Sequence, residues 1–148
     1  MRLHHWILVF TLACGCAHAD SQQKVIPIGD FGLASGETLR DARVGYQTAG
    51  TLNDDKSNVI IFLTWFTGTA DNLVKFEVIG PGKLADTNRF HVIAIDALGN
   101  GVSSSPSNSP HQPGKKFPRI TISDMVNSQH ALLTRHLGIS RVHAVMGI

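Results

Sequence analysis

The sequence predicts an α/β fold, a mixed and mostly parallel sheet with crossover helices, and three observations support this class. Short apolar runs begin at Val59, His91 and Val142, and they lack the alternation of a half-exposed strand. Such runs are typical of strands that are covered on both faces. The segments between the runs are long enough for the crossovers that parallel strands require. One of these segments, residues 123–137, has apolar residues at helical spacing, so the order of elements is that of βαβ units.

Two earlier strands are expected within residues 24–32 and 39–50. Both segments contain short apolar stretches, and glycines and the Ser35-Gly36 turn separate them. Because they are close in the sequence, we expect them to form an antiparallel, hairpin-like pair. The last strand is expected over residues 141–148, as a buried strand that runs into Gly147.

The clearest helix is expected over residues 123–137. Thr121 or Ser123 can cap its start, and Gly138 stands where a left-handed residue commonly ends a helix. A shorter helix is expected over residues 71–78. The apolar residues of the long helix fall on one face: Met125, Val126, Leu132, Leu133 and Leu137.

Residues 97–119 predict a long surface loop. The segment holds four prolines, two glycines near its start and many serines, which exclude a regular element. Loops of this length within a compact domain tend to be functional. Loop polarity accounts for the Ser103-Ser104-Ser105 run, which no histidine or elbow glycine flanks.

Composition and spacing exclude several classes of function. A net charge of +2 gives no basic face for nucleic acid. His130 and His136 are six residues apart on the long helix, so they face different sides and cannot share a metal ion. Ser104 and Pro106 stand where a dinucleotide fingerprint needs a third glycine and a helix. We expect no nucleic-acid partner, no metal and no cofactor.

The first nineteen residues predict a cleaved secretory signal peptide. Arg2 precedes an apolar run over residues 6–13, and Ala17-His18-Ala19 forms a small-residue cleavage site. The apolar run is too short for a stable membrane span. We therefore expect residues 1–19 to be a signal peptide and the protein to be secreted or periplasmic.

Cleavage after Ala19 would leave residues 20–148 as the mature part of this sequence. Both cysteines, Cys14 and Cys16, lie in the removed segment, so the mature part would hold no thiol and no disulfide. Lipid attachment at Cys16 is an alternative.

Several separated blocks, in the right order, resemble one protein family. DALGNGVS at residues 96–103 resembles the loop after strand 4 of the α/β-hydrolase superfamily, and TWFTG at 64–68 occupies the place of the oxyanion loop after strand 3. The resemblance extends over residues 31–148 and implies the N-terminal part of an α/β-hydrolase domain. Four blocks resemble the homoserine O-acetyltransferase group of that superfamily: LRDARV at 39–44, IGPGK at 79–83, LGNG at 98–101 and FPRITISDMV at 117–126.

The resemblance implies acyl transfer by a serine nucleophile with a histidine base and an aspartate that orients it. In this superfamily the chain order is serine, acid, histidine, and the serine lies on a G-x-S-x-G elbow. Gly147-Ile148 matches the first two elbow positions. We therefore expect all three triad residues beyond Ile148, and these 148 residues by themselves to be inactive. Asp96 and Asp124 are not assigned the role of orienting acid.

One catalytic part is expected within the sequence. The oxyanion hole takes a backbone N–H from the loop after strand 3, and the resemblance implies that this donor belongs to Phe66. Trp65, Thr67 and Gly68 of the same loop are expected to contact the substrate. The rings of Trp65 and Phe66 alternatively pack over the sheet, which is compatible with the donor role because the backbone donates.

The resemblance leaves the acyl acceptor open. Homoserine O-acetyltransferases usually have histidine and alanine where Thr64 and Trp65 stand, and an exported transferase would need acetyl-CoA outside the cytoplasm. Water is always available there, so we expect an exported ester hydrolase that acts on a small-molecule ester or acyl donor. An O-acetyltransferase for homoserine or a similar alcohol is one alternative. A non-catalytic binding module is the second, because fold kinship alone does not determine function.

Overall fold

The computed structural model describes residues 22–65 and 67–148. The signal peptide expected over residues 1–19 lies outside this part. The elements are, in chain order, β1 (Lys24–Gly32), β2 (Thr38–Ala49), β3 (Val59–Leu63), α1 (Ala70–Lys75), β4 (Ile79–Gly80), β5 (Ala85–Asp86), β6 (His91–Ile95), a 3₁₀ turn (Gly114–Lys116), α2 (Ile122–Ala131), a π-helical turn (Leu132–His136) and β7 (Ala144–Gly147).

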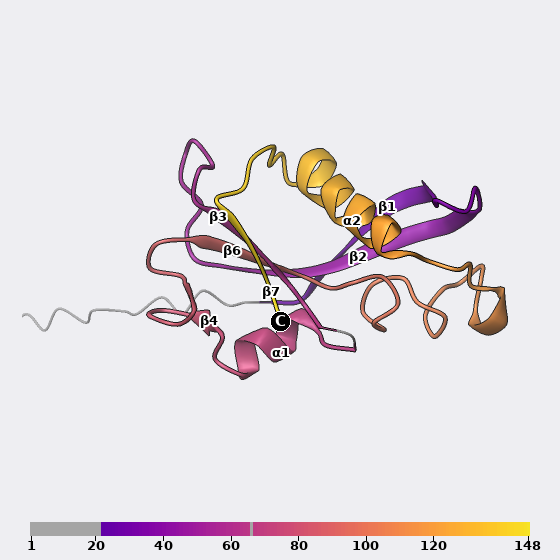
Figure 1. Cartoon of the computed structure of the whole chain (residues 1–148), viewed down its shortest axis with the longest axis horizontal. Coiled ribbons are helices and arrows are strands. Elements are labelled where there is room, and N and C mark those ends of the chain that lie inside the picture. Colours follow the sequence, from indigo (N-terminus) through magenta and orange to yellow (C-terminus); the bar gives the residue numbers. More distant parts are fainter. Residues whose placement is uncertain (1–21, 66) are drawn as a thin grey trace, which may run out of the picture.

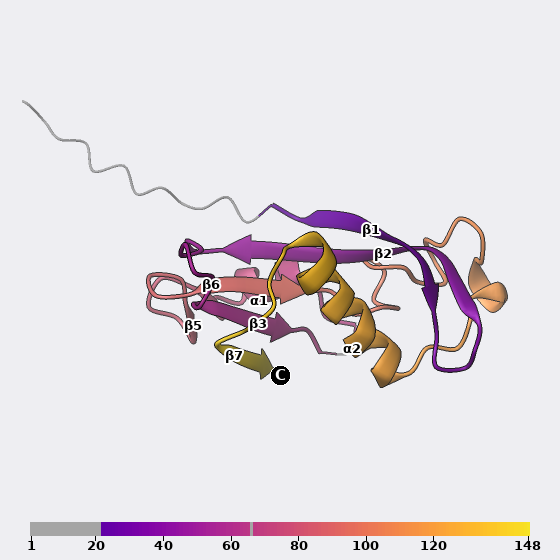
Figure 2. The same ribbon diagram turned by 90° about the horizontal axis from the view of Figure 1, so that it is seen from above.

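The main sheet has the strand order β1-β2-β6-β3-β7, and β4 and β5 form a separate small pair. β1 pairs with β2, and β2 with β6, in antiparallel fashion, whereas β6, β3 and β7 are parallel to one another. Figure 2 shows β6, β3 and β7 pointing the same way. The predicted mixed sheet and the predicted antiparallel pair at its start are confirmed.

The two helices cover opposite faces of the sheet, α1 on one side and α2 on the other (Figure 1). Phe62 of β3 packs in one buried cluster with Leu73 of α1, and Ile61 packs in the other with Leu132 and Leu133, which follow α2. Successive residues of β3 therefore enter two different apolar layers. This explains why the run that begins at Val59 is apolar throughout.

Strand β7 corrects the expectation of a buried strand over residues 141–148. The strand is shorter, Ala144–Gly147, and Val145 is 60% exposed. Among the described residues β7 lies at the edge of the sheet and pairs only with β3, and these residues do not fully cover its α2 face. Apolar sequence alone cannot distinguish an edge strand from a central one, because the neighbouring elements decide its burial.

Helix α2 begins at Ile122 and its cap is Thr121, whose hydroxyl accepts a hydrogen bond from the backbone N–H of Asp124. The predicted helix is regular only to Ala131, and residues 132–136 continue as a π-helical turn. Gly138, with φ of +62°, has the predicted left-handed conformation.

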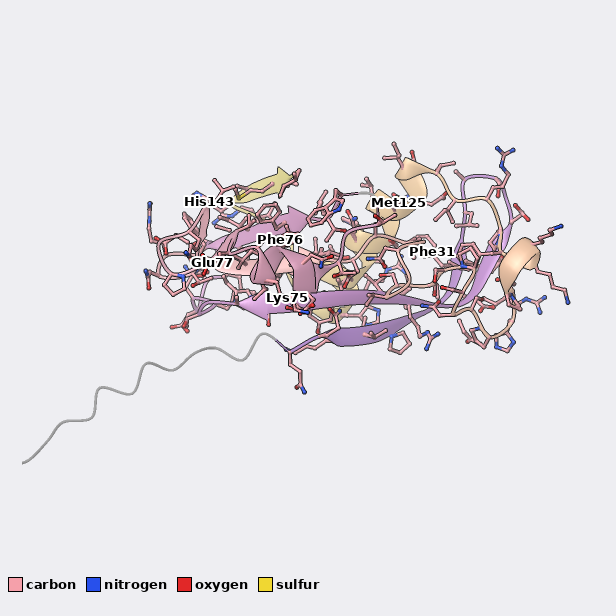
Figure 3. All side chains as sticks on the ribbon, turned by 90° about the horizontal axis from the view of Figure 1, so that it is seen from below. Phe31, Lys75, Phe76, Glu77, Met125 and His143 are labelled. Atoms are coloured by element: carbon pink, nitrogen blue, oxygen red, sulfur yellow. The ribbon has the colours of Figure 1, made fainter. Side chains whose placement is uncertain are left out.

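Two apolar residues of α2 do not share the predicted face. Val126 is 52% exposed, because it lies beside the uncovered surface of β7. Met125 instead packs near Phe31 against a small cluster under the β1–β2 hairpin (Figure 3). Helix α1 is also shorter than the expected 71–78, because Glu77 adopts a left-handed φ of +56°.

Asp124 holds the start of α2 in place and makes stability depend on pH. Its buried carboxylate accepts hydrogen bonds from the Thr121 hydroxyl at 2.7 Å, the Thr121 N–H at 2.8 Å and the Ala34 N–H at 2.7 Å. The Thr121 hydroxyl, followed by the N–H groups of Ala34 and Thr121, holds the pKa of Asp124 below its usual value despite burial. Because the folded pKa is lowered, this stabilisation is complete above about pH 3.9 and is lost as pH falls through the folded pKa.

We expect Asp124→Asn to lower the free energy of unfolding of the complete gene product by about 1 to 3 kcal/mol at pH 7, because an amide leaves a buried donor unpaired. The difference in the free energy of unfolding between wild type and variant should become smaller below about pH 3.9. Urea unfolding at several pH values measures it, with the exposed Asp54→Asn as control. A gap that is constant down to pH 2 would contradict the assignment.

Candidate functional site

Three loops leave the same edge of the sheet. In the parallel register Leu63 of β3 lies opposite Ile95 of β6 on one side and Gly147 of β7 on the other. The loops that begin at Thr64 and Asp96 therefore start beside the end of β7 (Figure 2). Ligands of open α/β sheets bind outside the carboxyl ends of the strands, so this edge is the candidate active site.

The loop between β3 and α1 makes a tight turn before the helix. Thr67 is exposed and has a left-handed φ of +68°. Gly68 donates its N–H to the Trp65 carbonyl at 2.9 Å. Thr69 then caps α1 and, with Asn72, forms a capping box. The box satisfies two backbone N–H groups at the start of the helix that would otherwise lack an acceptor.

The Trp65 indole turns towards α1. It stacks on the ring of Phe76 with 5.9 Å between the centroids (labelled Phe76 in Figure 3). A Cβ atom at Gly68 would lie 2.6 Å from the indole, so the indole needs a glycine there. Trp65 also packs against the buried cluster between α1 and the sheet, which agrees with the alternative interpretation for this ring. Substrate contact by Trp65, Thr67 and Gly68 stays a prediction. Phe66, the predicted oxyanion donor, lies outside the described residues.

The next loop presents a buried carboxylate to the loop between β3 and α1. Asp96, at the end of β6, is 1% exposed. One carboxylate oxygen accepts hydrogen bonds from the Ala70 N–H and from the Asn100 side-chain amide, both at 2.9 Å. The other oxygen accepts from the Gln23 amide at 2.9 Å. Sequence reasoning assigned Asp96 no role, although a carboxylate directly after a buried strand marks this site.

Asn100 joins the two loops. Its amide nitrogen also donates to the Gly68 carbonyl at 3.0 Å. Its amide oxygen accepts from the N–H groups of Val102 and Ser103, at 2.9 and 3.1 Å. Because donors surround the oxygen and acceptors surround the nitrogen, these partners determine the orientation of the amide.

The serine run corrects the expectation of a solvated surface loop. Ser103, Ser104 and Ser105 are all buried. The Ser103 and Ser104 hydroxyls accept hydrogen bonds from the N–H groups of Gly45 and Arg43, at 2.9 and 2.8 Å. These hydroxyls satisfy backbone groups of β2 beyond the segment that pairs with β6. Polar composition indicates exposure, and it misleads here because the hydroxyls replace a neighbouring strand.

Three of the described histidines contact groups outside this candidate site. A ring nitrogen of His91 lies 2.9 Å from the Gly50 carbonyl, and His143 packs on Phe90. His111 contacts the Asp41 carboxylate. Within residues 22–65 and 67–148, no group of three or more His, Cys, Asp or Glu side chains is arranged to hold a metal ion.

None of the helices in the described part of the chain has both the length and the apolar character that a membrane crossing requires.

The chain matches no protein-family model. Over 132 residues it is 44% identical to a homoserine O-acetyltransferase from Methanohalophilus mahii, an alignment that covers 79% of this chain and 27% of that protein. Over 125 residues it is 35% identical to an ethyl acetate hydrolase from Pseudomonas veronii, covering 84% of this chain and 36% of that protein. The chain thus spans about a third of the length of these curated relatives.

A solved structure is also similar to this chain in both sequence and fold. The crystal structure of an acetylester hydrolase from Corynebacterium glutamicum superposes with a TM-score of 0.80 at 37% identity, covering 85% of this chain and 36% of that one. Similarity in both sequence and fold, over the same partial coverage, matches the N-terminal portion of such proteins. The chain therefore belongs to the α/β-hydrolase superfamily, in the group that contains homoserine O-acetyltransferases and acetyl esterases.

Proposed function

We propose that the complete gene product is an exported ester hydrolase that cleaves small esters through a serine nucleophile. The observation that carries the proposal is the parallel pairing of Leu63 with Gly147. This pairing supports the proposal because the loop that follows β3, the predicted oxyanion loop, then starts beside the point where a nucleophile elbow would begin. A serine two residues after Gly147 would then complete G-x-S, with its hydroxyl close to the donors of that loop.

The chemistry follows from that arrangement. The serine oxygen attacks the ester carbonyl, a histidine accepts the serine proton, and the carbonyl oxygen becomes an oxyanion. The Phe66 backbone N–H and the N–H after the nucleophile would stabilise this oxyanion, and each such donor is worth about 3 to 4 kcal/mol at the transition state. The histidine then gives its proton to the leaving alcohol, and water hydrolyses the acyl-enzyme.

Hydrolysis is preferred over transfer for two reasons. Residues 1–19 have the pattern of a signal peptide. An exported transferase would need acetyl-CoA outside the cytoplasm, whereas a hydrolase needs only water. The relatives also include an ethyl acetate hydrolase. The similarity to a homoserine O-acetyltransferase favours a second candidate, transfer of an acetyl group to homoserine or a similar alcohol.

One experiment decides between these functions. The purified complete gene product is given ethyl acetate or p-nitrophenyl acetate in water, and separately acetyl-CoA with homoserine. We expect acetate release from the esters and little O-acetylhomoserine, with activity lost when the serine expected after Ile148 is replaced by alanine. A clear preference for homoserine and acetyl-CoA would support the transferase, and no acyl chemistry at all would support a binding module.

Export is tested on the same protein. Recovery from the periplasm or medium with Asp20 at its N-terminus would support cleavage after Ala19. Retention in the cytoplasm with Met1 or Arg2 at the N-terminus would contradict it.

A further inference from the structure

We propose that Asp96 and Asn100 are positioning residues that hold the oxyanion loop, residues 64–70, at the geometry that catalysis requires. The catalytic part of this inference rests on the proposed function. The structural part stands on the contacts between the β6 loop and the β3–α1 loop.

The contacts reach the far end of the oxyanion loop. Leu63 anchors the near end, because it belongs to β3 and pairs with β6 and β7. At the far end the Ala70 N–H donates to the Asp96 carboxylate at 2.9 Å, and the Gly68 carbonyl accepts from the Asn100 amide at 3.0 Å. The loop is therefore tethered on both sides of its predicted donor.

The carboxylate and the amide also hold each other. The Asn100 amide nitrogen donates to the same Asp96 oxygen that accepts from Ala70, at 2.9 Å. On its other side the Asn100 oxygen is held by the N–H groups of Val102 and Ser103. Neither side chain can turn without breaking several hydrogen bonds, so the position of one loop determines that of the other.

The burial of Asp96 indicates a geometric role. Its three donors, on Ala70, Asn100 and Gln23, are neutral groups, and no ion pair of Asp96 is found within the described residues. A buried carboxylate without a cation is costly, and an apolar side chain of similar size is often as stabilising. What an apolar side chain cannot do is specify the positions of three N–H groups.

The fold makes room for this carboxylate. A Cβ atom at Gly45 would lie 2.8 Å from an Asp96 oxygen and 2.6 Å from the Val102 side chain. β2 therefore carries a glycine beside this carboxylate. The loop that the carboxylate holds contains a left-handed residue, Thr67, which needs such external support.

The test compares matched variants of the complete gene product. Asn100→Ala removes the hydrogen bond from the Asn100 amide to the Gly68 carbonyl. Its control is Asn108→Ala, because Asn108 lies in the same loop and makes analogous bonds, to Gly101, Ser103 and Ser105, without contacting the oxyanion loop. Asp96→Asn removes the carboxylate that accepts from Ala70 and Asn100. Its control is Asp124→Asn, because Asp124 is also a buried carboxylate but caps α2.

Two readouts separate positioning from general stability. In Asn100→Ala and Asp96→Asn, hydrogen exchange of the amides in residues 64–70 should accelerate at least about tenfold. kcat for ester hydrolysis should fall about tenfold to a hundredfold, with KM changed less than about threefold, because a small misplacement of a catalytic donor affects the transition state. Both controls should keep wild-type kcat and wild-type exchange in this loop.

Unchanged exchange in the loop, or an equal loss of kcat in the Asn108 and Asp124 controls, would overturn the proposal. If Asp96→Asn does not fold, the comparison of Asn100→Ala with Asn108→Ala still tests the proposal, because Asn100 is only half-buried. If the wild-type protein hydrolyses no ester, the proposed function fails, while the exchange measurement still decides whether Asp96 and Asn100 position the loop.

Discussion

Replacing Phe62 with alanine is expected to lower the free energy of unfolding by about 3 to 5 kcal/mol, a large part of the stability of a typical domain. Phe62 of β3 is fully buried and packs in the cluster that joins the sheet to α1. Alanine would leave a cavity that neither the sheet nor the helix can close, because β3 is paired on both sides. Urea unfolding of the complete gene product measures the loss.

Two further variants show whether burial is the cause. Phe62→Leu keeps most of the volume and should cost less than about 1.5 kcal/mol. Phe76→Ala removes the same ring from a position that is 65% exposed, where the ring stacks on Trp65, and should cost about 1 kcal/mol. Equal losses in Phe62→Ala and Phe76→Ala would contradict the layered core described above.

Replacing Gly50 with alanine is expected to cost about 2 to 5 kcal/mol, from a left-handed backbone together with overpacking. Gly50 follows β2 with φ of +79°. A Cβ atom there would lie 2.2 Å from the Phe90 carbonyl oxygen and 3.0 Å from the Thr87 carbonyl oxygen. These are backbone atoms that cannot turn away as a side chain would, so the turn before β6 has to move.

Gly36→Ala separates the two causes. Gly36 has a similar φ of +84°, but a Cβ atom at this position would have no other atom within 4 Å. This variant should therefore show the backbone cost alone, about 1 to 2 kcal/mol. Thermal or urea unfolding of the two variants side by side is the measurement. Equal destabilisation would mean that the Phe90 segment relaxes freely, contrary to the tight approach in the structure.

Pattern and resemblance predicted much of the framework. The unbroken apolar runs at Val59 and His91 indicated strands covered on both faces, and both are central strands of the sheet. Parallel strands place their carboxyl ends at one edge, so the meeting of the loops after β3 and β6 was predictable. Local chemistry limited the cap of α2 to Thr121 or Ser123, because a hydroxyl at such a position satisfies free N–H groups of the first turn. The structure shows that Thr121 is the cap.

Other features depended on contacts between residues far apart in the sequence. The exposure of Val145 depends on which elements cover an edge strand, and the burial of Ser103 depends on free N–H groups of β2. The link from Asp96 to Ala70 joins residues 26 positions apart. Neither periodicity nor local propensity contains such information.

The sequence by itself determined the presence of the five strands of the main sheet, the approximate start of the long helix and the family, because apolar spacing, capping chemistry and motif order are local properties of the chain. Only the tertiary structure decided which carboxylate meets the loop between β3 and α1 and which apolar residues stay exposed. Those outcomes depend on distances and burial that arise when separate segments pack together, and a buried polar side chain acquires its role from the partners that packing brings to it.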